Sequence, residues 1–166
     1  MLKLIFQKMS QKGFLGVLRF VIALPYIFLR NLRRKKIFQL QNLDERFSYI
    51  YEKNHWQSRE SRSGEGSEIA YTENLRNKLT EIIEYYGIQN VVDAPCGDYN
   101  WMKKLRKTSH FSYIGIDIVW EIINSNIENY SDEITSFTVK NICTDLLPDC
   151  DLLIVRDCLF HLSYED

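Results

Sequence analysis

The chain is poor in the residues that metal sites and disulfide scaffolds require. Its 166 residues include three histidines and four cysteines, with no Cys-x-x-Cys pair and no histidine at zinc-ligand spacing from a cysteine. Scattered cysteines of this kind are typical of reduced thiols in a cytosolic protein. We therefore expect a cytoplasmic protein with neither disulfides nor a metal site. The cysteines are Cys96, Cys143, Cys150 and Cys158.

Glycine is also scarce where a nucleotide loop would need it. The stretch VVDAPCGDYNWM (91–102) has one glycine, whereas a dinucleotide-binding turn has three. Pro95 and Tyr99 stand where two further glycines are expected. No Walker sequence and no His-Glu-x-x-His sequence occurs, so phosphoryl transfer and zinc proteolysis have no support.

Acidic residues are absent from residues 1–43, which contain nine lysines and arginines. The other 12 basic residues face all 22 acidic ones, so residues 44–166 carry a net charge of −10, against −1 for the whole chain. This contrast predicts a basic apolar segment at 1–43 and a separate folded domain at 44–166. The charge of that domain argues against a nucleic-acid partner.

The basic segment lacks an unbroken apolar run. FLGVLRFVIALPYIFL (14–29) is interrupted by Arg19 and Pro25, and it is shorter than the about 20 residues that a spanning helix needs. Basic residues follow it up to Lys36, which favours a helix at 14–36 lying on the inner face of a membrane, against anionic lipid. Packing within the protein or on a partner, and true spanning, are the alternatives.

The rest of the chain alternates between helical and strand-like patterns. Apolar residues at helical spacing predict helices within 75–86, 99–106 and 119–129, and the polar stretch 55–68 reads as a loop. Strands alternating with helices imply parallel pairing and hence an α/β, Rossmann-like, doubly wound fold. The predicted strands are 88–94, 113–119, 134–139 and 151–155, and a further helix is expected to begin within 157–166.

Polar residues end every predicted strand. Ligands of doubly wound sheets bind at the carboxyl ends of the strands, and the four ends here carry Asp93–Asp98, Asp117, Asn141 and Arg156-Asp157. Asp117 follows Gly97 by 20 residues, the interval at which an acid reaches ribose hydroxyls. Capping of the next helix is its alternative role.

These motifs together resemble a known family. Asp-x-Pro-Cys-Gly-Asp followed by Trp-Met, then Tyr-x-Gly-x-Asp-Ile, and finally Arg-Asp-x-x-x-His-Leu are similar to class I S-adenosylmethionine-dependent methyltransferases. They are especially similar to a small-domain bacterial branch whose first motif reads PCGD, and the NHW and SRSGEGSE sequences upstream also resemble that branch. The resemblance covers roughly residues 45–166 and leaves the basic segment outside it.

The resemblance implies S-adenosylmethionine as cofactor and a small-molecule, glycan or lipid-linked methyl acceptor. The loop Pro95–Asp98 would hold the methionine portion, Asp117 the ribose, and Ile118 the adenine. Asn141 and Ile142 would meet the adenine edge and face, although the family usually has an acid at the position of Asn141. The complete set of expected cofactor residues is Trp56, Asp93, Pro95, Cys96, Gly97, Asp98, Asp117, Ile118, Asn141, Ile142 and Arg156.

Charge favours this cofactor over a dinucleotide. S-adenosylmethionine has an ammonium and a sulfonium but no phosphate, so an acid at Asp98 would tolerate it and repel a pyrophosphate. Asp98 either accepts from the ammonium or caps the helix beginning near Tyr99, and Asp93 is expected mainly to orient its loop. A nicotinamide-dependent oxidoreductase and a non-catalytic, membrane-associated remnant are the alternative functions.

His161 is the candidate catalytic base, with Asp157 orienting it or contacting the cofactor; packing within a helix is the alternative role of His161. Trp56 and the Ser63–Ser67 loop are either a lid over the cofactor or an ordinary linker. Class I methyltransferases have a larger sheet than four strands, so the fourth strand is expected to have an unpaired edge. The chain is then either a fragment or completes its sheet with a partner, and activity of the chain alone does not follow.

Overall fold

The computed structural model describes residues 23–26, 28–29, 31–32, 37, 40, 42–106 and 110–163. The chain divides into a unit of Met1–Gln41 and a unit of Asn42–Asp166. Most of the segment 14–36, for which we predict membrane-surface contact, lies outside the described residues. Among the residues that are described, no helix combines the length and the apolarity needed to cross a membrane.

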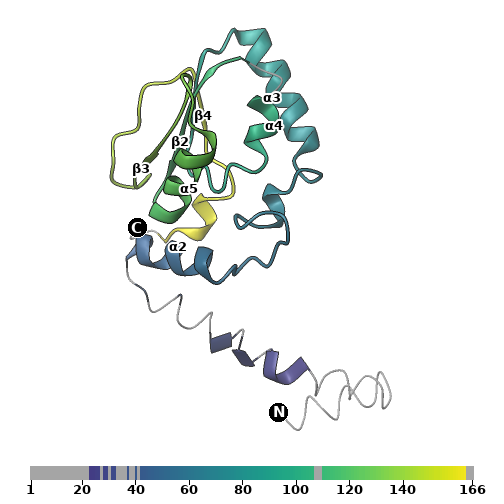
Figure 1. The fold of residues 1–166 in the computed structure, drawn as a ribbon, viewed down its shortest axis with the longest axis vertical. Coiled ribbons are helices and arrows are strands. Elements are labelled where there is room, and N and C mark those ends of the chain that lie inside the picture. The colour runs from purple at the N-terminus through teal and green to yellow at the C-terminus, as the bar shows by residue number, and fades with distance from the viewer. Residues whose placement is uncertain are drawn as a thin grey trace. The chain divides into compact units, whose positions relative to one another are not determined.

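A four-stranded parallel sheet forms the centre of the second unit (Figure 1). The strand order is β3-β2-β1-β4, and every neighbouring pair is parallel. The predicted α/β class and parallel sheet are therefore confirmed, and the order reverses between β1 and β4, where doubly wound sheets bind ligands. The strands are β1 (Asn90–Asp93), β2 (Ser112–Asp117), β3 (Thr135–Val139) and β4 (Leu152–Ile154).

The central strands are buried on both faces, as their runs of apolar residues predict. Val91 and Tyr113 point into one apolar cluster, and Val92 and Ile116 into another. Because successive side chains of a strand point to opposite faces, the two clusters lie on the two sides of the sheet. Among the strands that the structure describes, β4 pairs with β1 alone and forms one edge of the sheet.

Three helices cover one face of the sheet: α3 (Glu73–Tyr86), α4 (Met102–Arg106) and α5 (Trp120–Tyr130). Their positions agree with the predicted helices. Gly87 ends α3 in the left-handed conformation that a helix C-terminus favours, with φ +62°. The opposite face is covered by the connection between β3 and β4, which carries no helix among the described residues and runs on the other side of the sheet from α3 and α4 (Figure 1).

Two helical segments differ from expectation. Of the helix expected to begin within 157–166, the described residues 157–163 show only the short 3-10 helix η2 (Leu159–His161). Asp157 has a positive φ of +50° and Leu162 is extended, so regular helix cannot continue through either residue. The sequence reading also missed α2 (Leu43–Glu52), although Leu43, Phe47 and Ile50 have helical spacing and acids occupy its first turn.

Candidate functional site

A cavity of about 510 Å³ lies at the carboxyl ends of all four strands. Its volume is typical of sites for small molecules and cofactors. The chain segments that follow β1, β2, β3 and β4 all contribute to its lining, together with α2 and the loop 62–67. Of the predicted site residues, twelve line this cavity: Trp56, Asp93, Pro95, Cys96, Gly97, Asp117, Ile118, Asn141, Ile142, Arg156, Asp157 and His161.

The backbone N–H groups of the turn after β1 donate hydrogen bonds to other residues of the protein. The N–H of Cys96 donates to the carbonyl of Ile116 at 2.7 Å, and the N–H of Gly97 donates to Asp117 Oδ2 at 3.1 Å. The next N–H, of Asp98, donates to Ser63 Oγ at 2.9 Å. A phosphate-binding turn instead points such N–H groups at its ligand.

Gly97 itself is required by its surroundings. It has a φ of +56°, which glycine adopts without steric cost. A Cβ at this position would also overlap Ser63 Oγ. The single glycine of the motif therefore permits both the turn and the close approach of the loop that contains Ser63.

The side chain of Tyr99 explains why this position is not a glycine. Tyr99 also has a positive φ, of +59°, yet its ring is buried. It packs against Tyr113, Tyr130 and Phe137 with ring centroids 5.1 to 5.2 Å away. Tyr99 therefore has a packing role at a position where a dinucleotide-binding turn has glycine, which lets the backbone approach the ligand closely.

Asp117 joins the ends of β1 and β2. Its Oδ2 accepts from Gly97 N–H and its Oδ1 from Val119 N–H at 3.0 Å, just before α5 begins. Burial raises the pKa of Asp117 to about 6, while the backbone N–H bonds act in the opposite direction. With the N–H of Ile118, three backbone donors bond this carboxylate, which leaves acceptor capacity for a ligand hydroxyl. The N-cap residue of α5 is Val119 and no side-chain hydrogen bond caps this helix, so Asp117 does not have the alternative capping role; it lines the cavity.

Asp93 places an unsatisfied acceptor beside the cavity. Its carboxylate is 1% exposed, and Oδ2 accepts from the Tyr113 hydroxyl at 2.9 Å. Oδ1 is buried and has no hydrogen-bond partner. Burial raises the pKa of Asp93 to about 7, against the effect of the Tyr113 hydrogen bond. A buried oxygen without a partner is costly, so Asp93 is held in the fold at the expense of stability.

Asp98 is the one predicted site residue that does not line this cavity. Its carboxylate accepts from Ser61 Oγ at 2.9 and 3.0 Å and from Arg62 N–H at 2.8 Å. The Arg62 guanidinium in turn donates to the carbonyls of Tyr51 and Glu52 at the end of α2. Asp98 therefore fastens the preceding loop, and through it α2, to the strand ends.

The loop Ser63–Ser67 forms one wall of the cavity and includes the short 3-10 helix η1 (Glu65–Ser67). Arg156 donates to the carbonyl of Gly66 and forms an ion pair with Asp157 at 2.7 Å. The Arg156 guanidinium also lies over the Trp101 ring, 5.3 Å from its centroid. These contacts hold the wall against the end of β4.

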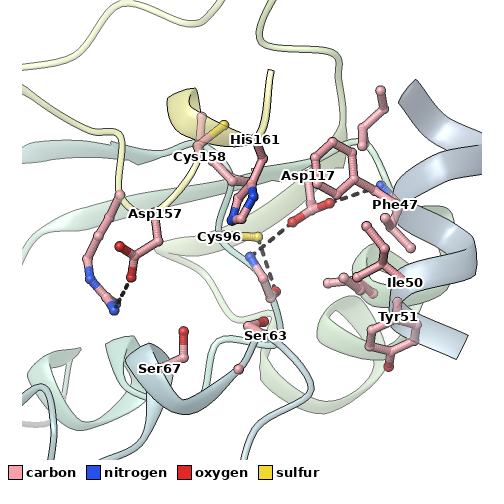
Figure 2. Close-up of a pocket in the computed structure, with 18 of the residues that line it drawn as sticks. Phe47, Ile50, Tyr51, Ser63, Ser67, Cys96, Asp117, Asp157, Cys158 and His161 are labelled. Carbon is pink, nitrogen blue, oxygen red and sulfur yellow. Dashed lines mark hydrogen bonds and ion pairs between the residues drawn. The ribbon is translucent and has the colours of Figure 1, made fainter. Parts of the chain in front are cut away.

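His161 is positioned by aromatic contacts rather than by Asp157. Its imidazole lies 4.9 Å from the Trp56 ring and 4.2 Å from the Phe160 ring, centroid to centroid. Burial lowers the pKa of His161, while the charge of Asp157 opposes the shift, so the neutral imidazole that a base requires is favoured. Within the described chain no hydrogen bond joins the side chains of His161 and Asp157; the Asp157 carboxylate is paired with Arg156 instead (Figure 2).

Two further predicted residues have local structural partners. Cys96 is buried, the pKa of its thiol is raised well above the usual value by burial, and Asn126 contacts its sulfur at 3.8 Å. Such a thiol is a packing group rather than a nucleophile. The Asn141 side-chain oxygen accepts from Cys143 N–H at 2.9 Å, which leaves it one lone pair for another donor.

Sequence reasoning missed the cavity wall supplied by α2. Leu43, Phe47, Ile50 and Tyr51 all line the cavity, as does the exposed Tyr71. The apolar spacing of 43, 47 and 50 was the available signal. Comparison with protein-family models, with curated proteins and with solved structures yields no match to this chain.

Proposed function

We propose that this chain binds S-adenosylmethionine and transfers its methyl group to a small-molecule, sugar or lipid-linked acceptor. The observation that carries the proposal is the bond between Asp117 and Gly97 N–H within one cavity at the carboxyl ends of the strands. It brings an acid with spare acceptor capacity and a tight turn together at the point where such sheets bind adenosine-containing ligands.

The residues present fit the charges of this cofactor. Asp117 would accept from the ribose hydroxyls, with Ile118, Asn141 and Ile142 around the adenine. At the β1 end, Asp93 lines the cavity and would supply a carboxylate for the ammonium group. Asp93 thus takes the contact that the sequence suggested for Asp98, whose own carboxylate is engaged by the loop.

The hydrogen bonds of the turn after β1 argue against the alternative of a nicotinamide-dependent oxidoreductase. A pyrophosphate needs free backbone N–H groups and a helix N-terminus close by. Here the N–H groups of residues 96, 97 and 98 all have partners in the protein, and α4 begins only at Met102. Binding a pyrophosphate would require breaking these bonds, whereas a methionine ammonium requires only acceptors.

Catalysis would rest mainly on alignment. The cofactor supplies an electrophilic methyl carbon, and an acceptor oxygen or nitrogen must approach it in line with the bond that breaks. The neutral imidazole of His161 is available to take the proton of an acceptor hydroxyl or amine. Trp56 holds the imidazole by stacking, and the loop Ser63–Ser67 limits access of water on one side.

Calorimetric titration of the full chain with S-adenosylmethionine and, separately, NAD tests the proposal. We expect heat with the former only, and a 10- to 150-fold weaker affinity for Asp117→Asn, as the loss of a hydrogen bond to a charged group predicts at about 1.5–3 kcal/mol. Asp149→Asn, a change at an exposed acid, is the matched control. The affinity should also fall as the pH drops below about 6, where Asp117 takes up a proton. No heat with S-adenosylmethionine, or tighter binding of NAD, would refute the assignment.

A further inference from the structure

The apolar face of α2 is buried without belonging to the core of the sheet. Leu43 and Ile50 are 9% and 7% exposed, and together with Phe47 they line the cavity. The two apolar clusters that the described residues form around the sheet contain none of the three. An amphipathic helix normally directs its apolar stripe at the core. Here the stripe is directed at a cavity.

This wall differs chemically from the strand ends. The acidic residues of α2, Asp44, Glu45 and Glu52, are exposed, and none of the charged residues of this helix lines the cavity. The α2 side therefore presents Leu43, Phe47 and Ile50, followed by the ring of Tyr51, whereas the strand ends present carboxylates. Figure 2 shows Phe47, Ile50 and Tyr51 along this side, with Asp117 and His161 between them and Asp157.

The α2 wall is long enough to contact an aliphatic chain. Residues 43 and 50 are seven positions apart on a helix, which corresponds to roughly 10 Å along its axis. A polar cofactor bound at the strand ends would gain little from such a surface, because its charged groups need acceptors and donors. An aliphatic group would gain about fourfold in affinity for each methylene that leaves water.

We propose that the α2 wall, Leu43–Phe47–Ile50, is the subsite for the aliphatic part of an amphiphilic methyl acceptor. The inference rests on the proposed function: the polar head of the acceptor lies near His161, where the methyl group arrives, and its tail lies along α2. The predicted contact of residues 14–36 with a membrane surface agrees with an acceptor of this kind, because it would bring the chain to a source of amphiphiles.

The test uses two sugar glycosides that differ in their tails. Octyl glucoside, kept below its micelle concentration, and methyl glucoside are each titrated into the full chain containing S-adenosylhomocysteine. Tryptophan fluorescence is the readout, because Trp56 and Trp101 line the cavity. We expect octyl glucoside to bind and methyl glucoside not to. Phe47→Ser should weaken octyl glucoside at least tenfold, Phe47→Leu should retain it, and Leu146→Ser, at a 91% exposed apolar residue, should change nothing.

The affinity for S-adenosylhomocysteine, measured on the same samples, separates the possible outcomes. If the wild type binds S-adenosylhomocysteine but not octyl glucoside, the subsite is refuted and the proposed function stands. If Phe47→Ser and Phe47→Leu both weaken S-adenosylhomocysteine as much as octyl glucoside, α2 covers the cofactor and the subsite is again refuted. If the wild type does not bind S-adenosylhomocysteine, the proposed function fails and the acceptor subsite fails with it.

Discussion

Removing the hydroxyl of Tyr113 should destabilise the protein more at alkaline than at acidic pH. In the folded chain this hydroxyl donates to Asp93 Oδ2 at 2.9 Å, and the other carboxylate oxygen has no partner. Tyr113→Phe therefore leaves a fully buried carboxylate without its side-chain donor. The cost depends on whether Asp93 is ionised, which makes pH the informative variable.

The magnitude follows from the pKa of Asp93, which burial raises from 3.8 to about 7. Because the folded pKa lies above the unfolded one, the stability linked to Asp93 is complete below about pH 4 and is lost as the pH rises through about 7, by up to about 4 kcal/mol. A hydrogen bond to a neutral acid contributes about 0.5–1.5 kcal/mol and one to a carboxylate about 1.5–3 kcal/mol. Tyr113→Phe should therefore cost about 1 kcal/mol more when Asp93 is ionised, and it should raise the pKa of Asp93 further.

Urea unfolding of the wild type and of Tyr113→Phe, at about pH 5 and about pH 8.5, measures this difference from the midpoints and slopes. Tyr130→Phe is the matched control, since it removes a hydroxyl from the same aromatic cluster without contacting Asp93. Equal destabilisation by Tyr113→Phe at the two pH values would show that Asp93 does not ionise in this range, and the assigned cause would be wrong.

Two further substitutions test how the β1 turn is held. Gly97→Ala should lower the free energy of unfolding by about 1–2 kcal/mol because of its positive φ, and by more because the added Cβ overlaps Ser63. Gly87→Ala has a similar φ and no atom within 4 Å of an added Cβ, so it should show the φ cost alone. Equal losses of stability on thermal unfolding would rule out the overlap. Asp98→Ala should release the loop that contains Arg62, so that trypsin cleaves it at least about tenfold faster, as the loss of one hydrogen bond to a charged group allows. Asp149→Ala should leave the cleavage rate unchanged, and a rate for Asp98→Ala no faster than this control would mean that Asp98 does not anchor the loop.

The secondary structure was largely predictable because its signals are local. Apolar runs marked the four strands, and helical spacing with Gly87 marked α3. The clustering of polar strand ends was predictable as well, since parallel strands bring their carboxyl ends to one edge. The apolar pattern after β4 predicted a helix, but Asp157 has a positive φ and Leu162 is extended, so the described residues there form a 3-10 helix in place of a regular helix.

The partners of individual site residues depended on long-range contacts that no local pattern encodes. Asp98 is 37 residues from Ser61, and only the folded loop between α2 and α3 reveals that its carboxylate faces Ser61 instead of the cavity. The buried contact between Tyr113 and Asp93 likewise depends on the pairing of β1 with β2.

Residues close in sequence were therefore sufficient to indicate an α/β sheet with polar residues at its strand ends, because periodicity and turn chemistry act over a few residues. Residues far apart had to be brought together before the cavity acquired its walls. The loop Ser63–Ser67 reaches the end of β4 through Arg156, and α2 reaches the strand ends through Arg62 and Asp98. These contacts decide which acids line the cavity, and they arise only when the whole domain has packed.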